Sequence, residues 1–185
     1  ALQSIGDDSN NVAVGYRALY NSTVSNNTAV GRDALYADTT GTENVAVGGN
    51  SLYANTTGND NTALGYQALY TATTALSNTG IGLKALYTVD GNGTTGSNNV
   101  AVGRKAGYNM STGYRNVCVG NNAGERITTG YQNTCVGNIA GYSTGQTGYN
   151  NTLLGYNAQC PADGTNNHFI LGNSSVDTLA CQQTS

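Results

Sequence analysis

The chain has 185 residues with seven basic and ten acidic side chains, which gives a formal net charge of −3. The basic residues stand singly, so no cationic stripe can neutralise a run of phosphates, and we expect no nucleic-acid partner. No apolar run approaches the roughly 18 residues of a membrane span, so we expect no membrane insertion. The 26 glycines, 26 asparagines and 25 threonines favour turns and strands over helices.

A repeated motif starts near the front of the chain and continues almost to its end. The stretch NVAVGYRALY at 11–20 returns as NTALGYQALY at 61–70. The glycines that close each short apolar run are Gly15, Gly31, Gly48, Gly65, Gly82, Gly103, Gly120, Gly137, Gly155 and Gly172. They are 16 to 18 residues apart, except for one step of 21 that contains the insertion TVDGNGTTGSNN. Ten coils of about 17 residues therefore fit the chain.

Three further columns keep the same register. Four places before the glycine stands an asparagine, replaced by His168 in the last coil; these residues are Asn11, Asn27, Asn44, Asn61, Asn78, Asn99, Asn116, Asn133 and Asn151. The residue two places before the glycine is Ala in half of the coils and Gly, Cys, Leu or Ile in the others, and the residue one place before it is always Val, Leu or Ile. Side chains alternate across a strand, so these two apolar columns face opposite sides. That pattern is typical of a parallel strand buried on both faces.

A second segment of each coil also alternates. Ala18, Leu19 and Tyr20 recur in later coils and predict a second short strand, and polar turns such as TTGTEN and STGYRN separate the coils. The sequence therefore predicts an all-β fold, a parallel β-solenoid (β-roll) of about ten 17-residue coils. We place the solenoid repeat domain at 1–160, and a terminal coil and C-terminal segment at 161–185.

The stacking of coils predicts both internal bonding and self-association. Identical residues of one column lie about 4.8 Å apart in stacked strands, so we expect the asparagines to form a hydrogen-bonded ladder. The strand has two apolar faces and the narrow coil can cover only one. A column of mostly Ala and Gly suits close approach of backbones, so we expect it to line contacts between copies in a homotrimer. A dimer or a separate covering domain are the alternatives.

The second half of the chain differs at one column. Four places after the register glycine, leucines such as Leu52 and Leu69 give way to Gly107, Gly124 and Gly141. Wherever the leucine is lost, a tyrosine stands in the following turn; these are Tyr114, Tyr131 and Tyr149. We interpret each ring as the cover of the space that the leucine vacated.

One column of tyrosines is a candidate surface contact. Its members are Tyr20, Tyr36, Tyr53, Tyr70 and Tyr87, continued by Tyr108 and Tyr142. Aromatic rows bind sugars and partner surfaces in many proteins, so a cell-surface glycan or protein receptor is a candidate partner. The favoured interpretation is a stacking ladder that stabilises the solenoid, because coil stacking alone produces ladders of identical residues.

The repeat resembles two known groups of proteins. The Asn-x-Ala-x-Gly motif is similar to the head repeats of trimeric autotransporter adhesins, which form parallel β-rolls in homotrimers. NTALGYQALY with its TTG turns, and the ending ILGNSSVDTLACQQTS at 170–185, more closely resemble phage and virus tail-fibre proteins that carry a self-cleaving C-terminal intramolecular chaperone. The resemblance covers residues 11 to about 160 and the ending. It implies a trimeric fibre segment of a virion tail fibre or cell-surface appendage, located outside the cell, with Ser185 as the candidate processing end.

Catalytic chemistry finds little support. His168 is the single histidine, and the acidic residues recur at no fixed column. We therefore expect no catalytic, cofactor or metal site and no enzymatic activity. The glycine-rich stretch GNGTTG at 91–96 lacks the lysine of a phosphate loop and predicts an enlarged loop, and contact of this loop with a ligand is the alternative.

The four cysteines divide into two pairs. Cys118 and Cys135 replace Ala in one column, and we expect buried free thiols. Cys160 and Cys181 lie where the repeat decays, and they are candidates for a disulfide within or between chains.

Two function classes remain open. The first is a structural fibre segment that supports or forms a receptor-binding surface. The second is a self-assembling extracellular filament, against which the atypical last coil argues. Ice binding is disfavoured because the paired threonines stand in turns.

Overall fold

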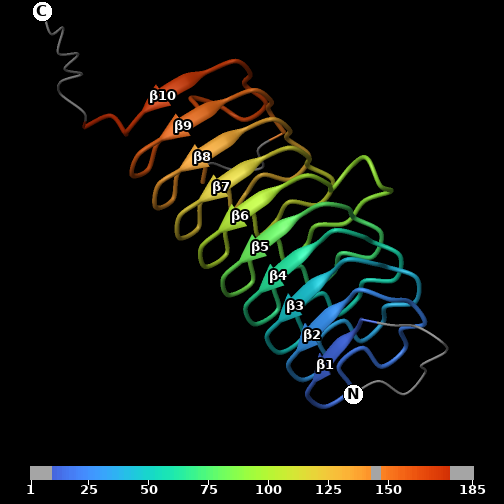
Figure 1. The fold of residues 1–185 in the computed structure, drawn as a ribbon. Coiled ribbons are helices and arrows are strands. Elements are labelled where there is room, and N and C mark those ends of the chain that lie inside the picture. The colour runs from blue at the N-terminus through green and yellow to red at the C-terminus, as the bar shows by residue number, and fades with distance from the viewer. Residues whose placement is uncertain (1–9, 143–146, 176–185) are drawn as a thin grey trace, which may run out of the picture.

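The computed structural model describes residues 10–142 and 147–175 as a parallel β-solenoid (Figure 1). Its strands are β1 (Val12–Val14), β2 (Thr28–Val30), β3 (Val45–Val47), β4 (Thr62–Leu64), β5 (Thr79–Ile81), β6 (Val100–Val102), β7 (Val117–Val119), β8 (Thr134–Val136), β9 (Thr152–Leu154) and β10 (Phe169–Leu171). The described residues contain no helix. The prediction of an all-β parallel solenoid is confirmed.

The strands form one parallel sheet in chain order, β1 to β10, so the chain makes about nine turns between the first strand and the last. The central residues of neighbouring strands lie opposite one another, as Ala46 does opposite Ala63. The insertion before β6 leaves this register intact, because Gly80 of β5 still pairs with Ala101 of β6. The extra residues instead project from the side of the solenoid as a loop (Figure 1).

The register glycines end the strands because no other residue fits there. Gly48 has a φ of 132°, and a Cβ atom on it would lie 2.6 Å from the carbonyl oxygen of Gly65 in the next coil. Gly65 meets Gly82 in the same way. Successive coils therefore touch backbone to backbone at this corner, and any side chain would force them apart.

The predicted second strand is wrong. The segment 50–53 and its equivalents are turns, in which Asn50 (φ 58°) and Leu52 (φ 47°) both adopt left-handed conformations. When residues of positive and negative φ alternate, successive side chains point to opposite sides. The sequence then shows the same two-residue alternation as a strand. A left-handed leucine is strained by about 1–2 kcal/mol, and the complete burial of Leu52 offsets this cost.

The prediction that the Ala column lies between copies is also wrong. The middle residues of β2 to β9, such as Ala46 and Ala101, are buried inside their own coil, whereas Ala13 and Ile170 in the end strands are partly buried. The first and third residues of each strand point outward instead, and Val14 and Leu64 are 57% and 45% exposed. The interior is narrow and needs the small side chain, so the face left for a partner is the one with the branched residues.

The interpretation of the Leu-to-Gly replacement is wrong as well. A Cβ atom on Gly124 would lie 2.4 Å from Sγ of Cys118 and 3.0 Å from Cδ1 of Ile127. On Gly107 the nearest atoms belong to Leu86 and Met110. The vacated space is therefore filled from inside the coil by Cys, Ile and Met. The tyrosines of the following turns lie half-exposed at the surface.

Cys118 and Cys135 are buried, unbridged thiols in neighbouring coils, as predicted. A hydrogen bond between the two thiols, together with burial, raises the pKa of Cys135, so it stays protonated. Cys160 is buried at the C-terminal end. Its proposed partner Cys181 and the candidate processing end Ser185 lie outside the described residues.

Candidate functional site

The asparagine column is an internal spine. The side-chain oxygen of each ladder asparagine accepts a hydrogen bond from the backbone N–H of the next at 2.8–3.0 Å, from Asn11 through Asn151, and the last donor is the backbone N–H of His168. Each side-chain amide donates to a turn carbonyl of the following coil, as Asn44 does to Gly58 at 2.8 Å. From Asn27 to Asn151 these residues are buried, so they hold the coils together and contact no partner.

Beside the spine, the N-terminal coils enclose a polar network that sequence reasoning missed. The carboxylate of Asp38 accepts hydrogen bonds from Oγ of Ser22 at 3.0 Å and Nδ2 of Asn55 at 2.9 Å, and from the backbone N–H of Gly41 at 3.2 Å. Burial raises the pKa of Asp38 to about 6, although these bonds oppose the shift. The feature of the sequence that indicates this network is the column seven places after the register glycine, which begins with Ser22, Asp38 and Asn55.

The outer face of the sheet has no charged side chain along its whole length. Its third-position column contains only Val, Leu and Ile, and its first-position column contains Val, Thr and one Phe, so neither column has a charged residue. The most exposed members are Val12, Val14, Val45, Leu64, Val100, Val136 and Phe169. An uncharged face of this regularity is unusual for a protein surface that meets only water.

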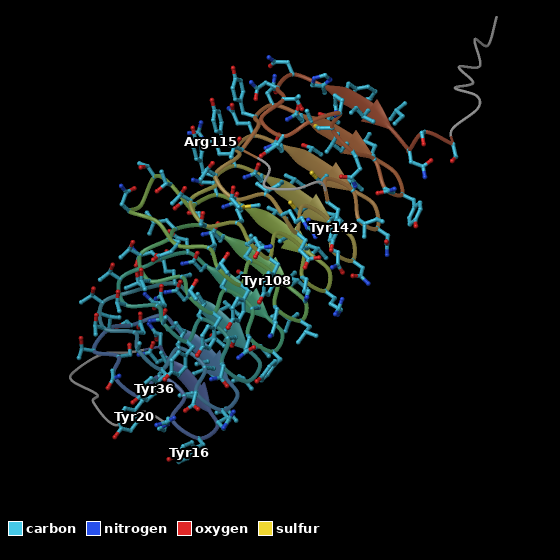
Figure 2. All side chains as sticks on the ribbon, turned by 180° about the vertical axis from the view of Figure 1, so that it is seen from behind. Tyr16, Tyr20, Tyr36, Tyr108, Arg115 and Tyr142 are labelled. Atoms are coloured by element: carbon cyan, nitrogen blue, oxygen red, sulfur yellow. The ribbon has the colours of Figure 1, made fainter. Side chains whose placement is uncertain are left out.

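The predicted tyrosine column is a continuous stack. Rings from Tyr20 to Tyr108 lie parallel with neighbouring centroids 5.0–5.5 Å apart, along the side of the solenoid shown in Figure 2. Tyr142 does not join this stack, because Glu125 occupies the intervening coil. Cations border the rings: the guanidinium of Arg17 lies 4.6 Å from the centroid of Tyr36 and forms a 2.7 Å ion pair with Asp33.

Stacking limits what this column can bind. Both faces of an interior ring such as Tyr53 are covered by its neighbours, so only ring edges and hydroxyls remain for a partner. Burial within the stack raises the pKa of Tyr70, and its hydroxyl therefore stays protonated. The parallel stacking of these rings fits the interpretation that the tyrosine column stabilises the solenoid. A receptor contact would have to use hydroxyl groups, or the free face of a ring at the end of a stack.

A second, shorter stack begins beside the insertion loop. Tyr114, Tyr131 and Tyr149 lie parallel with centroids 4.9 Å apart. The two stacks occupy different columns, one after the strand and one before it, so they mark different edges of the coil. Tyr114 is the first ring of its stack and also lines a pocket with the loop.

Within the described ranges 10–142 and 147–175, no group of three or more His, Cys, Asp or Glu residues is arranged to hold a metal ion. Over the same residues, no helix is long and apolar enough to cross a membrane. The described coils present three distinct surfaces, which are the outer sheet face, the tyrosine edges and the insertion loop.

The fold and these surfaces define a protein of the parallel β-solenoid class with an in-register asparagine spine. Comparisons with protein-family models, curated proteins and solved structures find no match to this chain.

Proposed function

We propose that this chain is a structural segment of a fibre on a virion tail or a cell surface. Three copies associate through the outer faces of their sheets, and the assembly supports or forms a receptor-binding surface outside the cell. The role is structural and not enzymatic. The number three comes from the resemblance to trimeric fibre repeats, whereas the uncharged outer sheet face supports the proposal that copies associate.

The uncharged outer sheet face is the observation that carries this proposal. The parallel sheets of α/β proteins have both faces covered, whereas here one face covers the coil interior and the other has no cover among the described residues. Another copy offers a face of the same length, spacing and composition. Two such faces can meet without charge repulsion. Each ~100 Å² of apolar surface that is removed from water stabilises the complex by about 2.5 kcal/mol, before the free-energy cost of association is subtracted.

A pair of matched variants tests which surface is used. Leu64 on the sheet face and Leu83 are similarly exposed, 45% and 41%, but Leu83 follows Gly82, where the chain has left the strand. We expect Leu64→Asp to reduce the assembly to single chains in multi-angle light scattering, and Leu83→Asp to leave it intact. Circular dichroism should show β-structure in both variants. Equal loss of assembly in both, or in neither, would contradict the proposed interface.

A filament that grows from its ends is the second candidate. The observation in its favour is that, within residues 10–142 and 147–175, β1 and β10 each pair on one side only, and Val14 and Phe169 are exposed at these ends. In that case the mean mass would rise steadily with protein concentration. Leu64→Asp would then have no more effect on the mass than Leu83→Asp.

A further inference from the structure

The pocket beside the insertion loop has the features of a small-ligand site. It is lined by Gly93, Thr94, Thr95, Asn98, Tyr114 and Arg115 and has a volume of about 370 Å³. Small-molecule sites occupy roughly 300–1,000 Å³, so this one is large enough for a single ring with its substituents. The inference below rests on the proposed receptor-binding role and gives it a location and a ligand class.

The free face of Tyr114 forms one side of this site. Its other face stacks on Tyr131 with parallel planes. One coil earlier, the column has a serine, and Ser97 is buried with its hydroxyl bonded inward: Oγ accepts from the N–H of Leu76 at 2.9 Å and donates to the carbonyl of Thr95 at 3.3 Å. Ser97 therefore does not cover the ring of Tyr114, and this face lies open to the pocket.

The loop that forms the opposite side is held in shape. Oδ1 of Asn92 accepts hydrogen bonds from the hydroxyls of Thr94 and Thr95 at 3.1 and 3.2 Å. The base of the loop is closed by Gly91 and Gly96, where a Cβ atom would lie 1.7 Å from the oxygen of Thr95 and 2.1 Å from that of Asp90. Because both threonine hydroxyls already donate to Asn92, their free lone pairs can accept hydrogen bonds from a ligand.

Arg115 gives the pocket its charge. Its side chain is exposed, and its guanidinium lies 5.9 Å from the ring centroid of Tyr114. Figure 2 shows Arg115 at the edge of the solenoid. No ion pair among the described residues involves Arg115, and no other residue that lines the pocket is charged. The pocket is thus locally cationic on a chain whose net charge is −3, which favours an anionic ligand.

These groups together describe one kind of ligand. An aromatic face attracts the C–H face of a saccharide ring, because the ring face is negative and the C–H bonds are slightly positive. The threonine oxygens accept from sugar hydroxyls, and the amide of Asn98 can donate and accept. A guanidinium binds a carboxylate with two parallel hydrogen bonds. We propose that this pocket binds a carboxylated sugar residue, either a uronic acid or a sialic acid.

Saturation-transfer NMR titrations of the full chain test this proposal. The probes are glucuronic acid, N-acetylneuraminic acid, and glucose as the neutral counterpart of glucuronic acid. Inorganic sulfate, which has no protons to observe, is added as a competitor. We expect at least one of the two acids to bind about tenfold more tightly than glucose, with the strongest transfer to protons on one face of its ring. Whichever acid binds more tightly identifies the source. Absence of binding of both acids at tens of millimolar, or displacement of the acid by an equal concentration of sulfate, would overturn the proposal.

Four variants locate the site. Arg115→Gln should reduce the affinity for the acid about tenfold, to that of the neutral sugar, and glutamine fits the backbone because Gln132 occupies the equivalent position with nearly the same φ. Arg126→Gln, which alters an Arg–Tyr pair at Tyr142 outside the pocket, should have no effect. Tyr114→Ala should abolish binding, whereas Tyr149→Ala, at the other end of the same stack, should preserve it. Equal effects within either pair would overturn the assignment.

Measuring the mass of the same sample separates this inference from the proposed fibre role. A trimer that binds neither acid overturns the sugar site alone. A single chain that binds one of them supports the sugar site and overturns the proposed assembly.

Discussion

The two halves of the solenoid fill the same interior from different positions. In the N-terminal coils a buried leucine four places after the register glycine fills the core, and the residue three places later is small or polar, as with Leu52 and Asn55. In two C-terminal coils the first position is Gly and the second is large, as with Gly107 and Met110 and with Gly124 and Ile127. The large core side chain therefore comes from a different position in each half. The backbone path therefore depends on the glycine corner and the asparagine spine, which both halves share, and not on which side chain fills the core.

The coil at β5 supports this interpretation. It contains both large residues, Leu86 and Val89, and its strand has Gly80 in place of the usual Ala. A Cβ atom on Gly80 would lie 3.3 Å from both the oxygen of Ala85 and Cγ of Leu69, which is closer than ordinary contact. The absence of a methyl group at Gly80 thus leaves room for the side chain of Leu69 from the preceding coil.

The largest effect is expected at the feature that the halves share. Gly48→Ala introduces a Cβ atom 2.6 Å from a backbone oxygen at a φ of 132°, and we expect a loss of about 4 kcal/mol in the free energy of unfolding. Gly120→Ala in the other half should cost as much. Gly49→Ala is the control, since its Cβ atom meets only ring carbons of Tyr66 at 3.4 Å or more. Urea denaturation measures all three variants, and a loss for Gly49→Ala equal to that for Gly48→Ala would contradict the role of the corner.

Placing the leucine of the first half at the equivalent glycine of the second half should destabilise the fold, and removing the side chains that fill that space should restore stability. Gly124→Leu places a side chain against Cys118 and Ile127, and we expect a loss of about 3 kcal/mol. The φ of 58° at this position is close to the 47° of Leu52, so the backbone itself tolerates leucine. Adding Cys118→Ala and Ile127→Ala should restore at least half of the loss. Additive destabilisation in the triple variant would show that the two fillings are not equivalent.

The buried carboxyl group in the first half predicts that the free energy of unfolding depends on pH through this half and not through the second. The pKa of Asp38 is raised from its ordinary value to about 6 in the folded state, so the folded protein binds this proton more tightly than the unfolded chain does. Stability from this group is greatest below about pH 4 and declines as the pH rises through about 6. Asp38→Asn mimics the protonated form. At pH 7 we expect the variant to be more stable than the wild type by about 2 kcal/mol.

The difference between Asp38→Asn and the wild type should vanish near pH 3.5, which thermal melts at several pH values can measure. Asp163→Asn is a control at an exposed carboxylate. A wild type that gains stability relative to Asp38→Asn as the pH rises would contradict the assignment of a strained, buried charge.

The smallest effect is expected in the tyrosine stack. Tyr53→Ala removes two ring contacts and Tyr20→Ala removes the single contact present within the described residues. Each aromatic pair contributes about 0.5–1.5 kcal/mol beyond its buried area, so Tyr53→Ala should cost about 1 kcal/mol more than Tyr20→Ala. Equal losses in chemical denaturation would show that the rings act separately.

The period, the register and the parallel sheet could be predicted because glycine and asparagine have specific chemical roles that repeat in the sequence. The second strand could not, since a left-handed Leu52 depends on burial that only the stacked coils supply. The sequence also could not show which of the two apolar columns faces the interior. Ala46 and Val47 are both apolar, and the width of the coil determines which of them is buried inside. The insertion loop was visible in the sequence, whereas the open face of Tyr114 required coordinates.

The mass of the chain in solution tests the central claim most directly. Sedimentation equilibrium of the wild type over a wide range of concentrations should give three times the chain mass of 18.9 kDa, without change down to low micromolar protein. A folded species of a single chain mass, stable across that range, would show that the outer sheet face needs no sister copy and would contradict the account.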